Sequence, residues 1–158
     1  MTLLLYGLSA AFALVTALTS TLSPHRAWGA VAVWGYLAAF LLVLFYRHRR
    51  LLVTWATFIA VALVPLIMQA VQRAGGRADR AQEEVLVVER MGERLASTGT
   101  PYLSHDAIAA LPSSSQLDAY SPYQPGMALF GLPRAWFGDA WWTDSRVWFF
   151  LATVVALG

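Results

Sequence analysis

Three uncharged apolar runs, each long enough to cross a lipid bilayer, fill the first half of the chain. They cover residues 3–21, 27–46 and 51–71. A helix rises ~1.5 Å per residue, so ~20 residues cross a hydrocarbon core ~30 Å thick. A chain in that environment must satisfy its own backbone polar groups, which restricts it to helices or closed barrels. The runs therefore predict an all-α integral membrane protein with three transmembrane helices in residues 1–71.

The composition agrees with a membrane protein and excludes several functional classes. Hydrophobic residues make up 58% of the chain and charged residues 13%, against roughly 25% charged residues in soluble domains. The net charge is only +2, so we expect no nucleic-acid partner. The absence of cysteine excludes disulfides, iron–sulfur clusters and thiolate zinc sites.

The first apolar run also fits a cleaved signal peptide. No Arg or Lys precedes residues 3–21, however, and the run is longer than the ~7–15 apolar residues of a typical signal peptide. We therefore interpret this run as a retained transmembrane helix.

Arginines between the runs predict the orientation. Residues 47–50 (RHRR) contain three arginines, whereas the turn at 22–26 contains one. Short cytoplasmic loops are enriched in Arg and Lys. We therefore place 47–50 and the N-terminus in the cytoplasm, and the polar segment 72–141 outside the plasma membrane.

The segment 72–141 contains nearly all of the chain's carboxylates and is interpreted as an extracytoplasmic loop. An amphipathic helix is predicted over 82–97, because Gly99 closes it. A short helix is expected at 104–111. Residues 126–138 are apolar but too short to span a bilayer, which favours a re-entrant or interfacial element.

The last residues, 142–158, begin a further apolar helix. Residues 147–158 cover only ~18 Å at ~1.5 Å per residue, which is less than a bilayer. We therefore expect three to four transmembrane helices here, and a longer protein of which this chain is the N-terminal part. Asp139, Asp144 and Arg146 flank the final run and are interpreted as interfacial charges.

One carboxylate of the predicted amphipathic helix falls on its apolar face. At ~100° per residue, Glu84 lies on the same line as Val88 and Met91. A buried carboxylate is costly unless it is paired, and carboxylates placed in this way are candidate general bases. An ion pair with Arg80, four residues earlier, is the structural alternative.

The opposite side of this helix is predicted to meet water. It carries charged residues of both signs, which pair with each other at helical spacing. These residues are Glu83, Glu89, Arg90, Glu93 and Arg94.

Two proline-containing turns in the loop carry tyrosines. They are residues 99–102 (GTPY) and 120–123 (YSPY). Proline fixes φ and restricts the residue before it, so both turns are expected to be rigid. Tyr102, Tyr120 and Tyr123 are therefore candidates for an aromatic wall against a sugar ring or lipid headgroup. An interfacial aromatic belt would use the same residues.

His105 lies in the same loop and is a further candidate substrate-binding residue. Its neighbour Asp106 is the only potential ligand beside it, and one His with one Asp does not make a metal site. We expect neither a metal nor a cofactor.

The stretch from Glu84 through 99–102 (GTPY), 120–125 (YSPYQP) and 130–133 (FGLP) resembles the first catalytic loop of a family of bacterial membrane glycosyltransferases. These are the C-type, polyprenyl-phosphate-sugar-dependent enzymes, and in particular the actinobacterial α-mannosyltransferases of the lipid-mannoside pathway. The resemblance covers about residues 80–135. The family's acid is usually Asp, and many members have Tyr-Pro-Pro in the second turn where this chain has Tyr-Gln-Pro.

The resemblance implies transfer of mannose, or another hexose or pentose, from a polyprenyl-phosphate donor to a lipid or cell-wall glycan acceptor. The Glu84 carboxylate would deprotonate the acceptor hydroxyl, which attacks C1 of the sugar with inversion. Tyr102, Tyr120, Tyr123 and His105 would contact the substrates. Membrane lipids are the remaining expected partners.

Two other functions remain open. A non-catalytic scaffold or partner subunit would use the loop as an interaction surface, and Glu84→Gln would then be silent. A transporter would place polar or charged residues inside its spans, and the three apolar runs carry no charge. We rank the enzyme first, the scaffold second and the transporter third.

Overall fold

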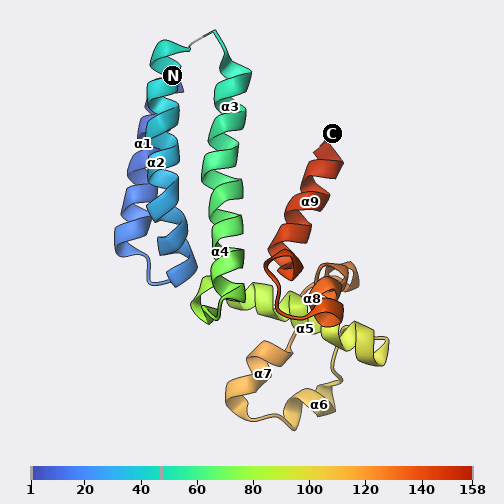
Figure 1. Ribbon diagram of the computed structural model, residues 1–158. Coiled ribbons are helices and arrows are strands. Elements are labelled where there is room, and N and C mark those ends of the chain that lie inside the picture. Colours follow the sequence, from blue (N-terminus) through green and yellow to red (C-terminus); the bar gives the residue numbers. More distant parts are fainter. Residues whose placement is uncertain (1, 47, 158) are drawn as a thin grey trace. The chain divides into compact units, whose positions relative to one another are not determined.

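The computed structural model describes residues 2–46 and 48–157, which form helices with no strand among them (Figure 1). This confirms the predicted all-α class. The chain divides into two compact units. The N-terminal unit comprises Met1–Arg73 and Arg77–Arg80, and the C-terminal unit comprises Ala74–Gly76 and Ala81–Gly158.

The first half of the chain forms three helices that are long and apolar enough to cross a membrane. The first two are α1 (Thr2–Thr19) and α2 (Ser23–Phe45). The third consists of α3 (Arg50–Phe58), the π-helical turn η1 (Ile59–Leu63) and α4 (Val64–Ala74). All three lie within four residues of the predicted apolar runs. The prediction of three membrane-length helices is therefore confirmed.

Small residues allow α1 and α2 to pack with their backbones close together. A Cβ atom added to Gly29 would lie 2.6 Å from the carbonyl oxygen of Ala13 and 2.7 Å from the amide nitrogen of Ala17. A Cβ atom on Gly35 would lie 2.7 Å from Cγ1 of Val61 in η1. Lipid tails are as apolar as leucine, so helices in a membrane associate through close packing of this kind.

The π-helical turn lies immediately before a proline. Pro65 has no N–H to donate to the carbonyl of Val61, four residues earlier. The indole N–H of Trp28 donates to that carbonyl instead, at 2.8 Å. Nearby, the side-chain amide of Gln69 donates to the carbonyl of Pro24 at 3.2 Å. These two bonds from side chain to backbone tie α2 to the third helix.

The C-terminal unit consists of helices and short 3₁₀ turns arranged around α5 (Glu83–Thr98) (Figure 1). Helix α5 ends at Gly99, whose φ of 76° is the left-handed conformation that glycine adopts readily. The following elements are α6 (His105–Ala109), α7 (Ser113–Ala119), η3 (Pro125–Phe130), α8 (Leu132–Phe137), η4 (Trp141–Thr143) and α9 (Ser145–Leu157).

Sequence patterns anticipate most of these elements. The helix predicted over 82–97 differs from α5 by one residue at each end, and α6 lies inside the expected 104–111. The apolar stretch 126–138 corresponds to η3, which begins one residue earlier, and to α8, with Gly131 between them. Helix α9 is apolar but has 13 residues, fewer than the three membrane-length helices. A fourth span remains a prediction.

Two glycines bring α5 against the start of α8. A Cβ atom on Gly92 would lie 2.6 Å from Cα of Gly131, and one on Gly131 would lie 2.9 Å from Cα of Glu89. Only glycine leaves room for two backbones at this distance. The crossing fixes the part of α5 that is buried, namely Val88, Glu89, Met91 and Gly92.

Candidate functional site

Helix α5 carries carboxylates in two different environments. Glu84 lies in the first turn and is exposed to solvent. Within the described part of the chain, no hydrogen bond or ion pair engages its carboxylate. The predicted burial of Glu84 on an apolar face is therefore wrong. Glu84 has the same angular phase as Val88 and Met91, but burial is confined to the middle of the helix.

Glu89 is the buried carboxylate of α5, with 3% of its surface exposed. Its Oε2 lies 3.2 Å from Nε of Arg134 on α8. The backbone N–H of Ser145, at the start of α9, donates to its Oε1 at 3.3 Å. Arg134 also pairs with the exposed Asp139. The expectation that Glu89 faces water is wrong, because Arg134 and Ser145, which lie 45 and 56 residues later in the sequence, bind its carboxylate.

A second buried carboxylate lies beside the first residue of α9. Asp144 is 1% exposed and accepts two hydrogen bonds from the Arg146 guanidinium, each of 2.8 Å. The backbone N–H of Arg146 donates to the same carboxylate at 3.1 Å. A negative charge at this position also interacts favourably with the positive end of the helix dipole. Asp144 is therefore buried and paired, and its position at a membrane interface stays a prediction.

Glu89, Asp144 and their two arginines form a paired cluster, which we call the α9 anchor (Glu89, Arg134, Asp144, Ser145 and Arg146). Each carboxylate has an arginine partner and a backbone N–H donor. Carboxylates held in this way stabilise the start of a helix, and neither has a free oxygen directed at a substrate. The sequence signal for the cluster was the charged run beside the final apolar segment, but its partner on α5 was not visible there.

The two tyrosine turns meet in the structure. The Tyr102 hydroxyl donates to the backbone carbonyl of Tyr123 at 2.7 Å, across 21 residues of sequence. Ser121 in the second turn donates to the sulfur of Met91, at 2.8 Å, on the buried side of α5. Tyr120 is 56% exposed, and Tyr123 is half-buried. The turns therefore form one tyrosine corner (Tyr102, Tyr120 and Tyr123), held against α5.

His105 lies outside this corner. It is the first residue of α6, exposed to solvent, and the side chain of Ser104 caps that helix by accepting from the N–H of Ala107. Among the described residues, no group of His, Asp and Glu has the arrangement of a metal site. The structure does not place His105 with the tyrosines, and its role as a substrate contact stays a prediction.

Two charged groups, one in each unit, have perturbed pKa values. Burial, with Arg90 nearby, lowers the pKa of Arg94, whose guanidinium donates to the carbonyl of Ala119 at 3.2 Å. In the N-terminal unit, hydrogen bonds from Arg77 and Ser23 lower the pKa of Asp79 to about 2.

Arg80 is engaged within the N-terminal unit. Its guanidinium donates to Gln72 at 2.6 Å, to Ser23 at 2.7 Å and to Asp79 at 2.9 Å. These bonds occupy the side chain that the sequence offered as an ion-pair partner for Glu84.

Comparison with protein-family models, curated proteins and solved structures yields no match.

Proposed function

We propose that this chain belongs to a membrane glycosyltransferase that transfers a sugar from a polyprenyl-phosphate donor to a lipid or glycan acceptor outside the plasma membrane. The observation that supports the proposal is the difference in environment between two carboxylates of α5, Glu84 and Glu89. Glu89 is buried and paired, whereas Glu84 is exposed and has no polar partner among the described residues. A general base needs an accessible carboxylate that is free to accept a proton.

In the proposed reaction, Glu84 accepts the proton of an acceptor hydroxyl. The hydroxyl oxygen forms a bond to C1 of the sugar as the bond from C1 to the phosphate oxygen breaks. Polyprenyl phosphate leaves with the electron pair, and the configuration at C1 inverts. The α9 anchor supports this step indirectly, because it holds the middle of α5 rigidly and so fixes where the helix begins.

The tyrosine corner is the proposed surface for the sugar or the lipid headgroup. The hydroxyl of Tyr102 is already used in a hydrogen bond, so the ring itself remains for contact. The exposed ring of Tyr120 is available in the same way. Aromatic faces present an apolar body to a sugar ring while their polar edges stay in water.

Replacing Glu84 tests the assignment. The assay uses membranes that contain the full-length protein. We expect Glu84→Gln to lower the rate of mannose transfer from radiolabelled polyprenyl-phosphate mannose by about 10²- to 10⁴-fold, the usual contribution of a general base. Glu83→Gln is the matched control, because Glu83 is exposed in the same helical turn, and it should retain activity within about threefold.

Two outcomes would contradict the proposal. If Glu84→Gln and Glu83→Gln transfer equally well, Glu84 is not the base. If the unmodified protein transfers no sugar from polyprenyl-phosphate mannose or from the corresponding hexose and pentose donors, the scaffold function is favoured instead.

A further inference from the structure

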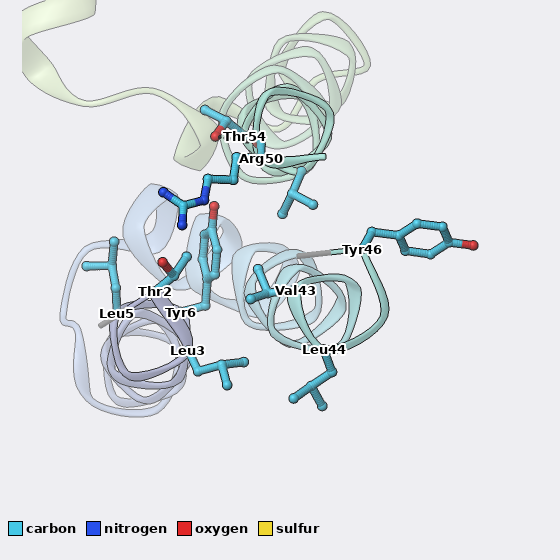
Figure 2. Close-up of a pocket in the computed structure, with 10 residues that line it drawn as sticks. Thr2, Leu3, Leu5, Tyr6, Val43, Leu44, Tyr46, Arg50 and Thr54 are labelled. Atoms are coloured by element: carbon cyan, nitrogen blue, oxygen red, sulfur yellow. Dashed lines mark hydrogen bonds between the residues drawn. The ribbon is translucent and has the colours of Figure 1, made fainter. Parts of the chain in front are cut away.

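A cavity of about 590 Å³ lies in the N-terminal unit, between the beginning of α1, the end of α2 and the start of α3. Its polar lining comes from Thr2, Tyr6, Arg50 and Thr54. Figure 2 shows the Arg50 side chain extending from α3 towards Tyr6 and Thr2 on α1. The remaining lining consists of leucine and valine side chains from α1, α2 and α3, together with Tyr46, which follows α2.

Two polar groups of this cavity, the Arg50 guanidinium and the Tyr6 hydroxyl, are donors that have no acceptor among the described residues, where neither makes a hydrogen bond or an ion pair. The hydroxyl of Thr54 is already used, since it donates to the carbonyl of Arg50 at 3.0 Å. A guanidinium beside a phenol hydroxyl presents several N–H and O–H donors to one point, which is the arrangement that a phosphate oxygen accepts.

The charge of this part of the chain favours an anion. Residues 1–78 contain no carboxylate, Asp79 being the first in the sequence. Arg49 and Arg50 therefore have no acidic neighbour in the first three helices to neutralise them. A zwitterionic headgroup would bring an ammonium group to an uncompensated positive site, whereas an anionic headgroup brings only its negative charge.

The apolar walls favour a lipid over a free ion. Leu5 is 61% exposed, Leu44 46% and Tyr46 52%, so these lining side chains would contact acyl chains if the three helices span a membrane. Inorganic phosphate gains nothing from such walls, whereas the acyl chains of a phospholipid would cover them. We propose that this cavity binds the phosphate of an anionic phospholipid, held by Arg50 and Tyr6.

The test is lipid retention by the full protein in detergent, measured by native mass spectrometry with added phosphatidylglycerol or phosphatidylcholine. We expect the unmodified protein to retain phosphatidylglycerol about fivefold or more better than phosphatidylcholine, the factor that one arginine contributes at an anionic surface. Arg50→Gln should abolish this preference, and Tyr6→Phe should reduce it.

Arg49→Gln is the matched control, because Arg49 is an exposed neighbour that does not line the cavity. It should keep the preference. An equal loss in Arg49→Gln and Arg50→Gln would overturn the proposal, since it would indicate a diffuse positive surface. An unchanged preference in Arg50→Gln would also overturn it.

Two further measurements address whether the site binds a lipid or free phosphate, and whether Arg50→Gln acts through misfolding. Excess inorganic phosphate should not displace the retained phosphatidylglycerol, and displacement would show a phosphate site in place of a lipid site. If Arg50→Gln does not elute as a folded species in size-exclusion chromatography, Tyr6→Phe decides, because it removes one oxygen and keeps the ring. A preference unchanged in Tyr6→Phe would then overturn the proposal.

Discussion

Two glutamates five positions apart on one helix lie in opposite environments in this chain. Glu89 has 3% of its surface exposed, pairs with Arg134 and accepts the first N–H of α9, whereas Glu84 is exposed in the first turn of α5. Residue type does not distinguish the two, and helical phase, which places them about 140° apart at ~100° per residue, predicts the reverse of the burial observed. The difference comes from position along the helix axis, since only the middle of α5 is covered.

Loss of the Glu89 charge should destabilise the fold. We expect Glu89→Gln to lower the free energy of unfolding by about 3 kcal/mol, because Arg134 would lose its buried partner and keep only the exposed Asp139. Equilibrium unfolding of the full protein in mixed detergent micelles measures this. Glu93→Gln, at an exposed position on the same helix, should change stability by less than about 0.5 kcal/mol. Equal stabilities of the two variants would contradict the role assigned to Glu89.

The pKa of Asp79 depends on its hydrogen bonds. Hydrogen bonds from Arg77 and Ser23 lower this pKa from 3.8 to about 2, so the ionised carboxylate stabilises the folded state above pH 3.8. That contribution is lost as the pH falls towards 2. We expect Ser23→Ala to raise the pKa, while Arg77 keeps it below 3.8. A titration followed by ¹³C NMR of labelled aspartate carboxyls measures the shift, with Ser20→Ala as control. An unchanged Asp79 pKa in Ser23→Ala would contradict this account.

At the level of elements, sequence periodicity and run length predict which segments are helical but not how they meet. Apolar runs gave the three long helices to within a few residues, and Gly99 marked the end of α5 correctly. The helical wheel placed Glu84 and Glu89 wrongly, because burial on α5 depends on Gly131, Arg134 and Ser145. These partners lie more than 40 residues away, and periodicity carries no information about pairing at that separation.

The crossing of α5 and α8 provides a sharp test of element packing. We expect Gly131→Ala to lower the free energy of unfolding by about 2 kcal/mol, because a Cβ atom would lie 2.9 Å from Cα of Glu89 and would push the two backbones apart. Gly126→Ala is the control, since a Cβ atom there meets nothing within 4 Å. Thermal unfolding of both variants in detergent compares them, and equal midpoints would contradict the packing described.

At the scale of the whole molecule, the three membrane-length helices indicate a membrane protein, and the side of the membrane on which each loop lies remains a prediction from the arginine distribution. These 158 residues contain no cysteine, so an introduced cysteine is the only thiol within them, and the same protein without the introduced cysteine is the control for background labelling. In intact cells, we expect Ser115→Cys to react with a membrane-impermeant maleimide, because residues 72–141 are predicted to lie outside.

The matching variant on the other side is His48→Cys, which should react only after the cells are opened. Both substituted positions are exposed in the structure, so access to the reagent depends on the compartment and not on burial. The reverse labelling pattern would contradict the orientation, and with it the proposal that Glu84 acts outside the plasma membrane.

The bond from Trp28 to Val61 has a consequence for biogenesis. Ribosomes release a chain from its N-terminus onward, so the indole donor on α2 is made before the segment that contains Pro65. The carbonyl that proline leaves without a partner therefore finds its donor already present when it enters the bilayer. If the segment containing Val61 and Pro65 entered the bilayer before α2, the Val61 carbonyl would face lipid without a donor until α2 arrived. An unpaired carbonyl in lipid costs several kcal/mol.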